Sequence, residues 1–260
     1  MYQYETLAVE CKEGTAQVML NRPDVYNAFN EIQIEELTDC FSQLSEDGNV
    51  HAVILTGKGR HFCAGADLNW MQKVASYTRE ENIADSRKMG EMFRTINSCS
   101  KPVVGRINGS AFGGGVGLVA VCDVCVCSDQ AVFAFSEVKL GIVPAVISRY
   151  VIPKIGLSHA RSLFMTGERF SAQKALEIGL VHHVCPLDEL DTKTEEQLTL
   201  LQSSGPQALK AAKELVQKWP ALEEDEFRAY TEELIVDLRA SEEGKEGIRA
   251  FLEKRKPVWR

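Results

Sequence analysis

Two short stretches decide the fold: Phe62-Cys63-Ala64-Gly65-Ala66-Asp67-Leu68 and, about fifty residues later, Phe112-Gly113-Gly114-Gly115-Val116-Gly117-Leu118. Each stretch places small residues where a predicted strand gives way to a predicted helix. Because such residues carry little or no side chain, a backbone N–H there can approach a ligand closely. Two N–H groups that converge on one oxygen form an oxyanion hole, which stabilises the anion formed when a carbonyl group reacts. The two stretches therefore predict a site for carbonyl chemistry.

The composition is that of an ordinary globular protein. The chain has 260 residues, of which 45% are hydrophobic and 25% are charged, and this length suits one large domain. No apolar run approaches the roughly 18–20 residues that span a membrane, and the first residues lack the basic start and apolar centre of a signal peptide. The net charge of −8 disfavours general binding to nucleic acid. We therefore expect a protein that binds neither membranes nor nucleic acid.

The eight cysteines are expected to be free thiols. Cys122, Cys125 and Cys127 lie in an apolar run, where free cysteine packs as a small hydrophobic side chain. Cys122 and Cys125 form a C-x-x-C motif, but no second cysteine pair or nearby histidine completes a zinc site. Free thiols are typical of a reducing compartment, so we predict a cytoplasmic protein without a metal site.

The order of predicted elements indicates an α/β fold. Strand patterns at 6–9, 15–20, 52–56, 101–107, 124–127 and 132–135 alternate with helical patterns in the first two thirds of the chain. The clearest helix runs over 30–44, with Asn30 as its N-cap. Helical patterns then dominate, at 158–166, 172–178, 187–202, 206–219 and 221–253. We therefore predict an α/β core over residues 1–195 and a C-terminal helical region over 196–260.

Several blocks of sequence, in their order along the chain, resemble the crotonase (enoyl-CoA hydratase/isomerase) superfamily. The resemblance covers nearly the whole chain, and the ordered set is far stronger than a lone glycine run. It implies a spiral of ββα units that forms two roughly perpendicular sheets, and a C-terminal helical region that builds homotrimers, commonly stacked as homohexamers. The matching blocks lie at 20–29, 62–68, 102–123, 135–144, 166–172, 179–181 and 251–257.

The resemblance also implies the ligand. The substrate would be an acyl-CoA thioester, so coenzyme A would enter as part of the substrate and no separate cofactor is expected. By position, the backbone N–H groups of Ala66 and Gly114 would bind the thioester oxygen. Gly114 would begin a helix whose dipole favours the developing anion.

Further residues are implied to bind coenzyme A. Ala64, Asp67 and Leu68 would line its path through their backbone atoms. Phe251 and Lys254 match positions that, in the family, reach the adenine and 3′-phosphate bound by a neighbouring subunit. The basic residues at 254–256 also fit a solvated charge cluster at the end of the chain, so both interpretations remain open.

Glu137 is the predicted proton-transfer group. The resemblance places one glutamate of a typical hydratase at Glu137 and a second at Gly117, which has no side chain to transfer a proton. Glu137 follows a strand pattern and is flanked by apolar residues. Such surroundings would raise the pKa of its carboxyl group and suit it to proton transfer near neutral pH. We therefore expect a site with one carboxylate.

Three functions remain open for such a site. The first is a hydratase in which one water supplies both the OH and the H, with Glu137 acting as base and then as acid. For this function the matched blocks resemble bacterial 3-methylglutaconyl-CoA hydratases of leucine catabolism. The second is a Δ3,Δ2-enoyl-CoA isomerase, which needs one carboxylate to move a proton. The third is a non-catalytic acyl-CoA- or RNA-binding protein, but the acidic helix at 30–44 contains no Lys or Arg and disfavours RNA. We predict hydration of a branched, carboxylated enoyl-CoA.

A distal carboxylate on the substrate would need a basic partner. Basic residues on a polar helix are commonly solvated, so position alone does not choose among the candidates. They lie in the helical segment 70–97 and beyond the Glu137 block: Lys73, Arg79, Arg87, Lys88 and Arg149.

Overall fold

Two β-sheets form the centre of the molecule. The computed structural model describes residues 2–259, and its larger sheet has six strands in the order β1-β2-β3-β4-β6-β9. β1 pairs antiparallel with β2, and every other neighbouring pair is parallel. All of β3 is buried, as expected for a parallel strand covered on both faces. The strands are β1 (Leu7–Lys12), β2 (Thr15–Leu20), β3 (Ala52–Gly57), β4 (Val103–Ile107), β6 (Val124–Ser128) and β9 (His183–Cys185).

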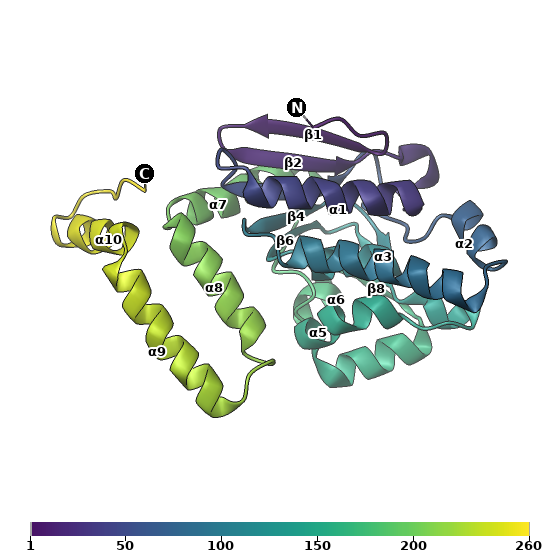
Figure 1. The fold of residues 1–260 in the computed structure, drawn as a ribbon. Coiled ribbons are helices and arrows are strands. Elements are labelled where there is room, and N and C mark those ends of the chain that lie inside the picture. Colours follow the sequence, from purple (N-terminus) through teal and green to yellow (C-terminus); the bar gives the residue numbers. More distant parts are fainter. Residues whose placement is uncertain (1, 260) are drawn as a thin grey trace.

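Helices α1 (Glu31–Glu46) and α3 (Arg79–Asn97) lie side by side across one face of this sheet (Figure 1). The sequence predicts α1 correctly, including its cap, because the Asn30 side chain accepts a hydrogen bond from the Gln33 N–H. The apolar side chains of α1, among them Phe41, are buried against the sheet at helical spacing. The first half of the chain therefore forms the predicted α/β arrangement of strands and helices.

The smaller sheet orders β5 (Ala111–Phe112), β7 (Val132–Ala134) and β8 (Arg169–Ser171). An isolated bridge between Cys63 and Ala111 joins β5 to the 62–68 stretch. The two deciding stretches of the sequence therefore meet at this sheet. Three helices alternate with its strands along the chain: α4 (Gly114–Ala120), α5 (Ala145–Thr166) and α6 (Ala172–Glu177).

Helix α5 is longer than the sequence pattern predicts. The predicted helix begins at residue 158, but α5 begins at Ala145 and continues through a kink at Gly156, whose φ is +74°. Pro153 and Gly156 interrupt the helical pattern of the sequence. Buried Ile147 and Val151 hold the first half of α5 against the core. Tertiary packing thus overrides the local helix breakers.

Four helices end the chain: α7 (Leu190–Gln202), α8 (Pro206–Lys218), α9 (Glu224–Ala240) and α10 (Glu242–Leu252). α7 packs on β3, β4 and β6. Helices α8–α10, here called the C-terminal arm, extend away from the sheets (Figure 1). The predicted boundary at residue 195 falls inside α7, and the division into two parts stays a prediction.

One predicted helix is in fact two. The pattern over 221–253 predicts a continuous helix, but Ser241 ends α9 with extended backbone (φ −66°, ψ 157°). The Ser241 side chain then accepts a hydrogen bond from the Gly244 N–H and caps α10. Likewise, α7 begins after the 3-10 turn Leu187–Glu189 rather than at residue 187. Capping geometry, rather than apolar spacing, sets these boundaries.

The prediction of free thiols is confirmed. All eight cysteines are free, and only Cys11 on β1 is exposed while the other seven are buried. Within residues 2–259, no helix is both long and apolar enough to cross a membrane. The same residues contain no group of three or more His, Cys, Asp or Glu side chains placed to hold a metal ion.

Candidate active site

The Ala66 N–H is directed away from the strand beside it. In an isolated parallel bridge, the Phe29 N–H donates to Gly65 O at 2.8 Å and the Asp67 N–H donates to Phe29 O at 3.0 Å. Because successive residues of an extended segment direct their N–H groups to opposite sides, the N–H between these two faces the other way. Gly65 has a φ of +89°, which glycine adopts without strain.

The two deciding stretches touch at α4. A Cβ built on Gly65 would lie 3.7 Å from the Gly114 nitrogen, and one built on Gly115 would lie 2.3 Å from the Cys63 carbonyl oxygen. The ring of Phe29 also leaves no room for a side chain at Gly114, where a Cβ would lie 2.4 Å from Phe29 Cζ. Glycine at 114 and 115 is therefore what allows the two backbones to approach this closely.

Both backbone donors are unpaired. Among residues 2–259, the N–H groups of Ala66 and Gly114 donate no hydrogen bond, whereas the neighbouring Gly113 N–H donates to Ala134 O at 2.9 Å. Gly114 is the first residue of α4, where a helix has unsatisfied donors and positive potential. Two neighbouring unpaired donors can bind a carbonyl oxygen on which negative charge develops.

Glu137 lies at the same end of α4. It belongs to the 3-10 turn Ser136–Leu140, and its Oε1 would lie 3.2 Å from a Cβ built on Gly113. Its Oε2 is buried and has no hydrogen-bond partner within residues 2–259. Burial raises the pKa of the Glu137 carboxyl group above its ordinary value. Such a carboxyl group beside an oxyanion hole can accept and return a proton near neutral pH.

The position of Gly117 is closed by apolar side chains. Gly117 lies one turn after Gly113 in α4, and its N–H donates to Gly113 O at 3.4 Å. A Cβ on Gly117 would lie 2.3 Å from Ile147 Cγ2 and 2.9 Å from Phe93 Cε1. Both side chains are buried in the core. The space where a second acid would stand is therefore filled by packing between α4, α5 and α3.

An ion pair that the sequence reasoning missed fixes the 64–68 segment. Arg22 Nη2 pairs with Asp67 Oδ2 at 2.8 Å, and a second Arg22 nitrogen donates to Ala28 O. Asp67 Oδ1 caps α2 (Leu68–Val74) by accepting a hydrogen bond from the Asn69 N–H at 2.8 Å. Burial acts to raise the pKa of Asp67, but the hydrogen bonds from Arg22 and α2 outweigh it and lower that pKa. Only tertiary structure brings Arg22 to this carboxylate.

The two ends of this segment differ in exposure, because Ala64 is partly buried and Leu68 is exposed. The Ala64 N–H donates to Tyr26 O at 3.0 Å, and the Leu68 side chain is 81% exposed. Asn27, which is fully buried, supports this loop by donating to the carbonyl oxygens of Lys58 and His61, both at 2.9 Å. Asn27 lies in the matching block 20–29, but its residue type alone does not predict this role.

Phe251 and Lys254 lie elsewhere in the chain. Phe251 is 82% exposed near the end of α10, and Lys254 follows with a φ of +54°. Figure 1 shows α10 at one end of the molecule and α2 at the other. A single chain thus does not bring these residues to Ala66 and Gly114. Their role at a neighbouring subunit stays a prediction.

A cavity beside the larger sheet lies apart from these residues. Its volume is about 810 Å³, and residues of β2–β4, α7 and the loop at 58–61 line it, but neither Glu137 nor Gly114 does. Part of its wall is the ion pair between Arg106 and Asp191, whose atoms Nε and Oδ1 lie 2.6 Å apart. A second cavity of about 360 Å³ lies on α3 and is lined by Arg79, Asn82, Ile83, Ser86 and Arg87.

Comparison with known proteins adds to this geometry. The family model for enoyl-CoA hydratase/isomerase matches residues 10–260. The chain is similar to the short-chain-enoyl-CoA hydratase of Clostridium acetobutylicum, with 34% identity over 252 residues that cover 94% of each chain. A crystal structure of an enoyl-CoA hydratase from Shewanella pealeana is 37% identical, with a TM-score of 0.94 over 99% of this chain and 97% of that one.

A third similar protein is AtuE of Pseudomonas aeruginosa, which is 34% identical with a TM-score of 0.95 over 98% of this chain and 99% of that one. Matches of this extent in both sequence and structure share one fold, the crotonase-type α/β fold. The chain therefore belongs to the enoyl-CoA hydratase/isomerase family of enzymes.

Proposed function

We propose that the chain is an enoyl-CoA hydratase with a single catalytic carboxylate, Glu137. The thioester oxygen of an α,β-unsaturated acyl-CoA accepts hydrogen bonds from the Ala66 and Gly114 N–H groups. Glu137 removes a proton from water, and the resulting hydroxide adds to Cβ while the electron pair of the double bond moves to form the enolate. Glu137 then delivers the same proton to Cα. One water is consumed, and the carboxylate is regenerated.

The main support for a single carboxylate is that packed side chains fill the space next to Gly117. Since Ile147 Cγ2 lies 2.3 Å from where a Cβ would stand, no side chain at 117 can share the proton transfers. The pKa of Glu137 also supports a single carboxylate. Burial raises that pKa, only a backbone hydrogen bond within Glu137 opposes it, and no second acid is among the causes. Both proton transfers therefore fall to one group.

Two arginines support a substrate with a distal carboxylate. Of the five basic candidates, Lys73 and Lys88 already pair with Glu31 and Glu35 of α1, at 2.5 and 2.7 Å. Arg79, Arg87 and Arg149 form no ion pair within residues 2–259, and of these three Arg79 and Arg87 line the cavity on α3. A guanidinium group suits bidentate binding of a carboxylate.

Packing between α3 and α5 connects the helix that lines this cavity to the segment that leads back to Glu137. Gly90 is one turn further along α3 than Arg87, and a Cβ on it would lie 3.9 Å from Val146 Cγ1 at the start of α5. The segment that leads into α5 folds back on the catalytic residue, because the Ile142 N–H donates to Glu137 O at 3.2 Å. We therefore place a branched, carboxylated enoyl-CoA of the 3-methylglutaconyl type first among the candidate substrates.

We also propose a location and an oligomeric state for the enzyme. Coenzyme A is part of the substrate, and no separate cofactor takes part. We place the enzyme in the cytoplasm, as a homotrimer or homohexamer assembled through the C-terminal arm. The support for assembly is a set of exposed apolar side chains on that arm, which monomeric proteins seldom leave uncovered: Val216, Trp219, Ile235, Val236, Ile248, Phe251 and Leu252.

Turnover of three thioesters tests the reaction type. Purified enzyme is given 3-methylglutaconyl-CoA, crotonyl-CoA and a 3-enoyl-CoA, and products are separated by chromatography. We expect hydration of the first at a kcat/KM at least about tenfold above that of the second. Conversion of the 3-enoyl substrate alone would make the enzyme an isomerase, which also needs one carboxylate. No turnover of any of them, together with intact binding, would leave a non-catalytic acyl-CoA-binding protein.

A pair of variants tests the distal carboxylate. R87Q should lower kcat/KM for 3-methylglutaconyl-CoA about tenfold and leave crotonyl-CoA unaffected, because only the first substrate has a charge to bind. K88Q is the matched control, since Lys88 is 61% exposed and pairs with Glu35 across to α1. An equal loss with both substrates would argue against this role for Arg87.

A further inference from the structure

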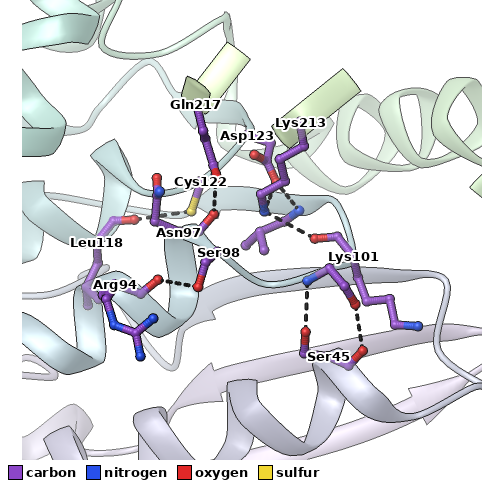
Figure 2. A network of polar contacts seen from close by, with 12 residues as sticks. Ser45, Arg94, Asn97, Ser98, Lys101, Leu118, Cys122, Asp123, Lys213 and Gln217 are labelled. Atoms are coloured by element: carbon purple, nitrogen blue, oxygen red, sulfur yellow. Dashed lines mark hydrogen bonds and ion pairs between the residues drawn. The ribbon is translucent and has the colours of Figure 1, made fainter. Parts of the chain in front are cut away.

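Asp123 is a junction between three parts of the chain. Its Oδ2 accepts hydrogen bonds from the Val103 N–H at 2.7 Å and from Lys213 Nζ at 2.8 Å. Lys213 Nζ also donates to Lys101 O at 3.3 Å (Figure 2). The Lys213 side chain is 11% exposed and that of Asp123 is 28% exposed, so solvent screens this pair less than the ion pairs on the surface. One carboxylate thus connects β4, α4 and α8.

Few other contacts hold the arm. Beyond Lys213, α8 reaches the sheets and their covering helices by one more hydrogen bond within residues 2–259, from Gln217 Nε2 to Asn97 O at 2.7 Å (Figure 2). Ala211 is the one buried residue that the described α8 and α9 contain. Polar contacts, rather than apolar packing, therefore set the position of α8 relative to the sheets.

The position of α8 is transmitted to α10. Glu243 of α10 accepts hydrogen bonds from the Gln207 N–H at 3.0 Å and the Ala208 N–H at 2.9 Å, at the start of α8. Beyond α10, Trp259 Nε1 donates to Ser203 O at 3.1 Å, at the end of α7 just before α8. Because the start of α10 is bonded to the start of α8, a shift of α8 carries α10 with it.

The segment that bears Asp123 is firmly held on the catalytic side. It directly follows Val121, the C-cap of α4, whose first residue is Gly114. Lys154 Nζ of α5 donates to Cys122 O at 2.6 Å, and Cys122 Sγ contacts Leu118 O at 3.2 Å. Lys213 therefore attaches the arm to the segment that directly follows α4, the helix that presents an oxyanion donor.

We propose that Lys213 is a positioning residue: its contact with Asp123 fixes the C-terminal arm relative to the active site, so that α10 meets the nucleotide half of an acyl-CoA bound at a second copy of the chain. The inference rests on the proposed function, since it takes acyl-CoA as the ligand and Phe251 and Lys254 as its distant contacts. It adds that a residue touching no substrate controls this part of the affinity.

Calorimetry with coenzyme A alone tests the proposal on the full chain. K213M keeps the length of the side chain and removes the charge, and D123N keeps an oxygen for the Val103 N–H. Each should weaken coenzyme A binding about tenfold, and the double variant should be no weaker than either one, because both remove the same contact. K210M is the control, since Lys210 lies on the same helix and its nearest acid is Glu214, 3.9 Å away on α8.

A second substrate separates positioning from damage to the fold. An acyl-pantetheine thioester lacks the nucleotide, so its kcat/KM should be the same in K213M and in the unsubstituted protein. Equal losses for both thioesters would overturn the positioning role. Coenzyme A binding by K213M equal to that of the unsubstituted protein would overturn the inference alone, whereas no binding by the unsubstituted protein would overturn the proposed function.

Discussion

The active-site region and the C-terminal arm are held by opposite means. Around Gly114 and Gly117, the backbones meet Phe29 and Ile147, which are 1% and 3% exposed, at distances that exclude even a methyl group. The arm depends on polar contacts such as Lys213 to Asp123 and leaves Trp219 68% exposed. A close-packed region cannot adjust to added volume, whereas a region held by a few hydrogen bonds can move as a unit.

This difference predicts where substitutions act. In the active-site region, added atoms or a lost carboxylate should affect chemistry or global stability. In the arm, equal changes should affect ligand affinity, assembly or local opening, because few buried apolar contacts tie it to the sheets. The variants below either strengthen that division or break it.

The largest effect is expected from E137Q. The amide keeps the shape of the side chain but cannot accept and return a proton, so kcat should fall about 10³-fold or more while binding of the thioester survives. Steady-state turnover and calorimetry measure the two quantities. Turnover near that of the unsubstituted enzyme would place the acid-base group elsewhere.

The pH dependence follows from the raised pKa of Glu137. The reactive form is the carboxylate, so kcat/KM should fall at acid pH with a midpoint above the ordinary value of 4.5, and E137Q should lack this limb. The effect of pH on stability runs the other way. The folded protein favours the protonated form of Glu137, so the stabilisation from this group is present at low pH and is lost as pH rises through its folded-state pKa. We therefore expect the free energy of unfolding in urea of E137Q, minus that of the unsubstituted protein, to be larger at pH 8 than at pH 4.

The next effect is expected from G114V. A side chain at 114 meets Phe29 Cζ at 2.4 Å and displaces the N–H donor, so both turnover and thioester binding should fall, kcat by about 10²-fold or more. Kinetics with the preferred thioester measure this. Normal kinetics in a variant that folds would remove Gly114 from the oxyanion hole.

A stability effect without loss of a functional group is expected from G117A. Its Cβ would lie 2.3 Å from Ile147 Cγ2, so the free energy of unfolding in urea should fall by about 1–3 kcal/mol. G48A is the matched control, because a Cβ on Gly48 would meet nothing within 4 Å. If the two variants were equally stable, the packing of α4 on α5 would be able to relax around the added methyl group, contrary to this prediction.

The smallest effect is expected in the arm, from S241A. Loss of the bond from the Gly244 N–H should cost about 1 kcal/mol of local stability, so amides of α10 should exchange several-fold faster while those of β3 do not change. T231A, which removes a hydroxyl inside α9, is the control. Faster exchange throughout the protein would show that the arm and the sheets open together.

Much of the candidate active site could be predicted because its signals are local. The small residues at 64–66 and 113–115 mark backbone positions where close approach matters, and the structure places both stretches together with Glu137 beside α4. The α1 cap at Asn30 is equally local. What the residue types alone do not reveal is that Ile147, thirty residues further along the chain, fills the space next to Gly117.

The features that escaped prediction are contacts between distant segments or competing local signals. The pairing of Arg22 with Asp67 joins residues 45 positions apart, and that of Lys213 with Asp123 joins residues 90 apart. The first half of α5 was hidden by Pro153, whose cost is met by tertiary packing. The break at Ser241 lay inside an apolar pattern that continues across it, and only the cap reveals the change of direction.

The thiol distribution makes the chain suitable for spectroscopy without engineering. With Cys11 alone exposed, a maleimide dye should attach mainly to the edge strand β1 of the native protein and give a defined single-site conjugate. Burial raises the pKa of Cys63, in the bridge that joins the 62–68 stretch to β5, to about 12, so its thiol is both hidden and protonated near neutral pH. After Cys11 is blocked, the rate at which a thiol reagent modifies Cys63 would then report how often the 62–68 stretch opens.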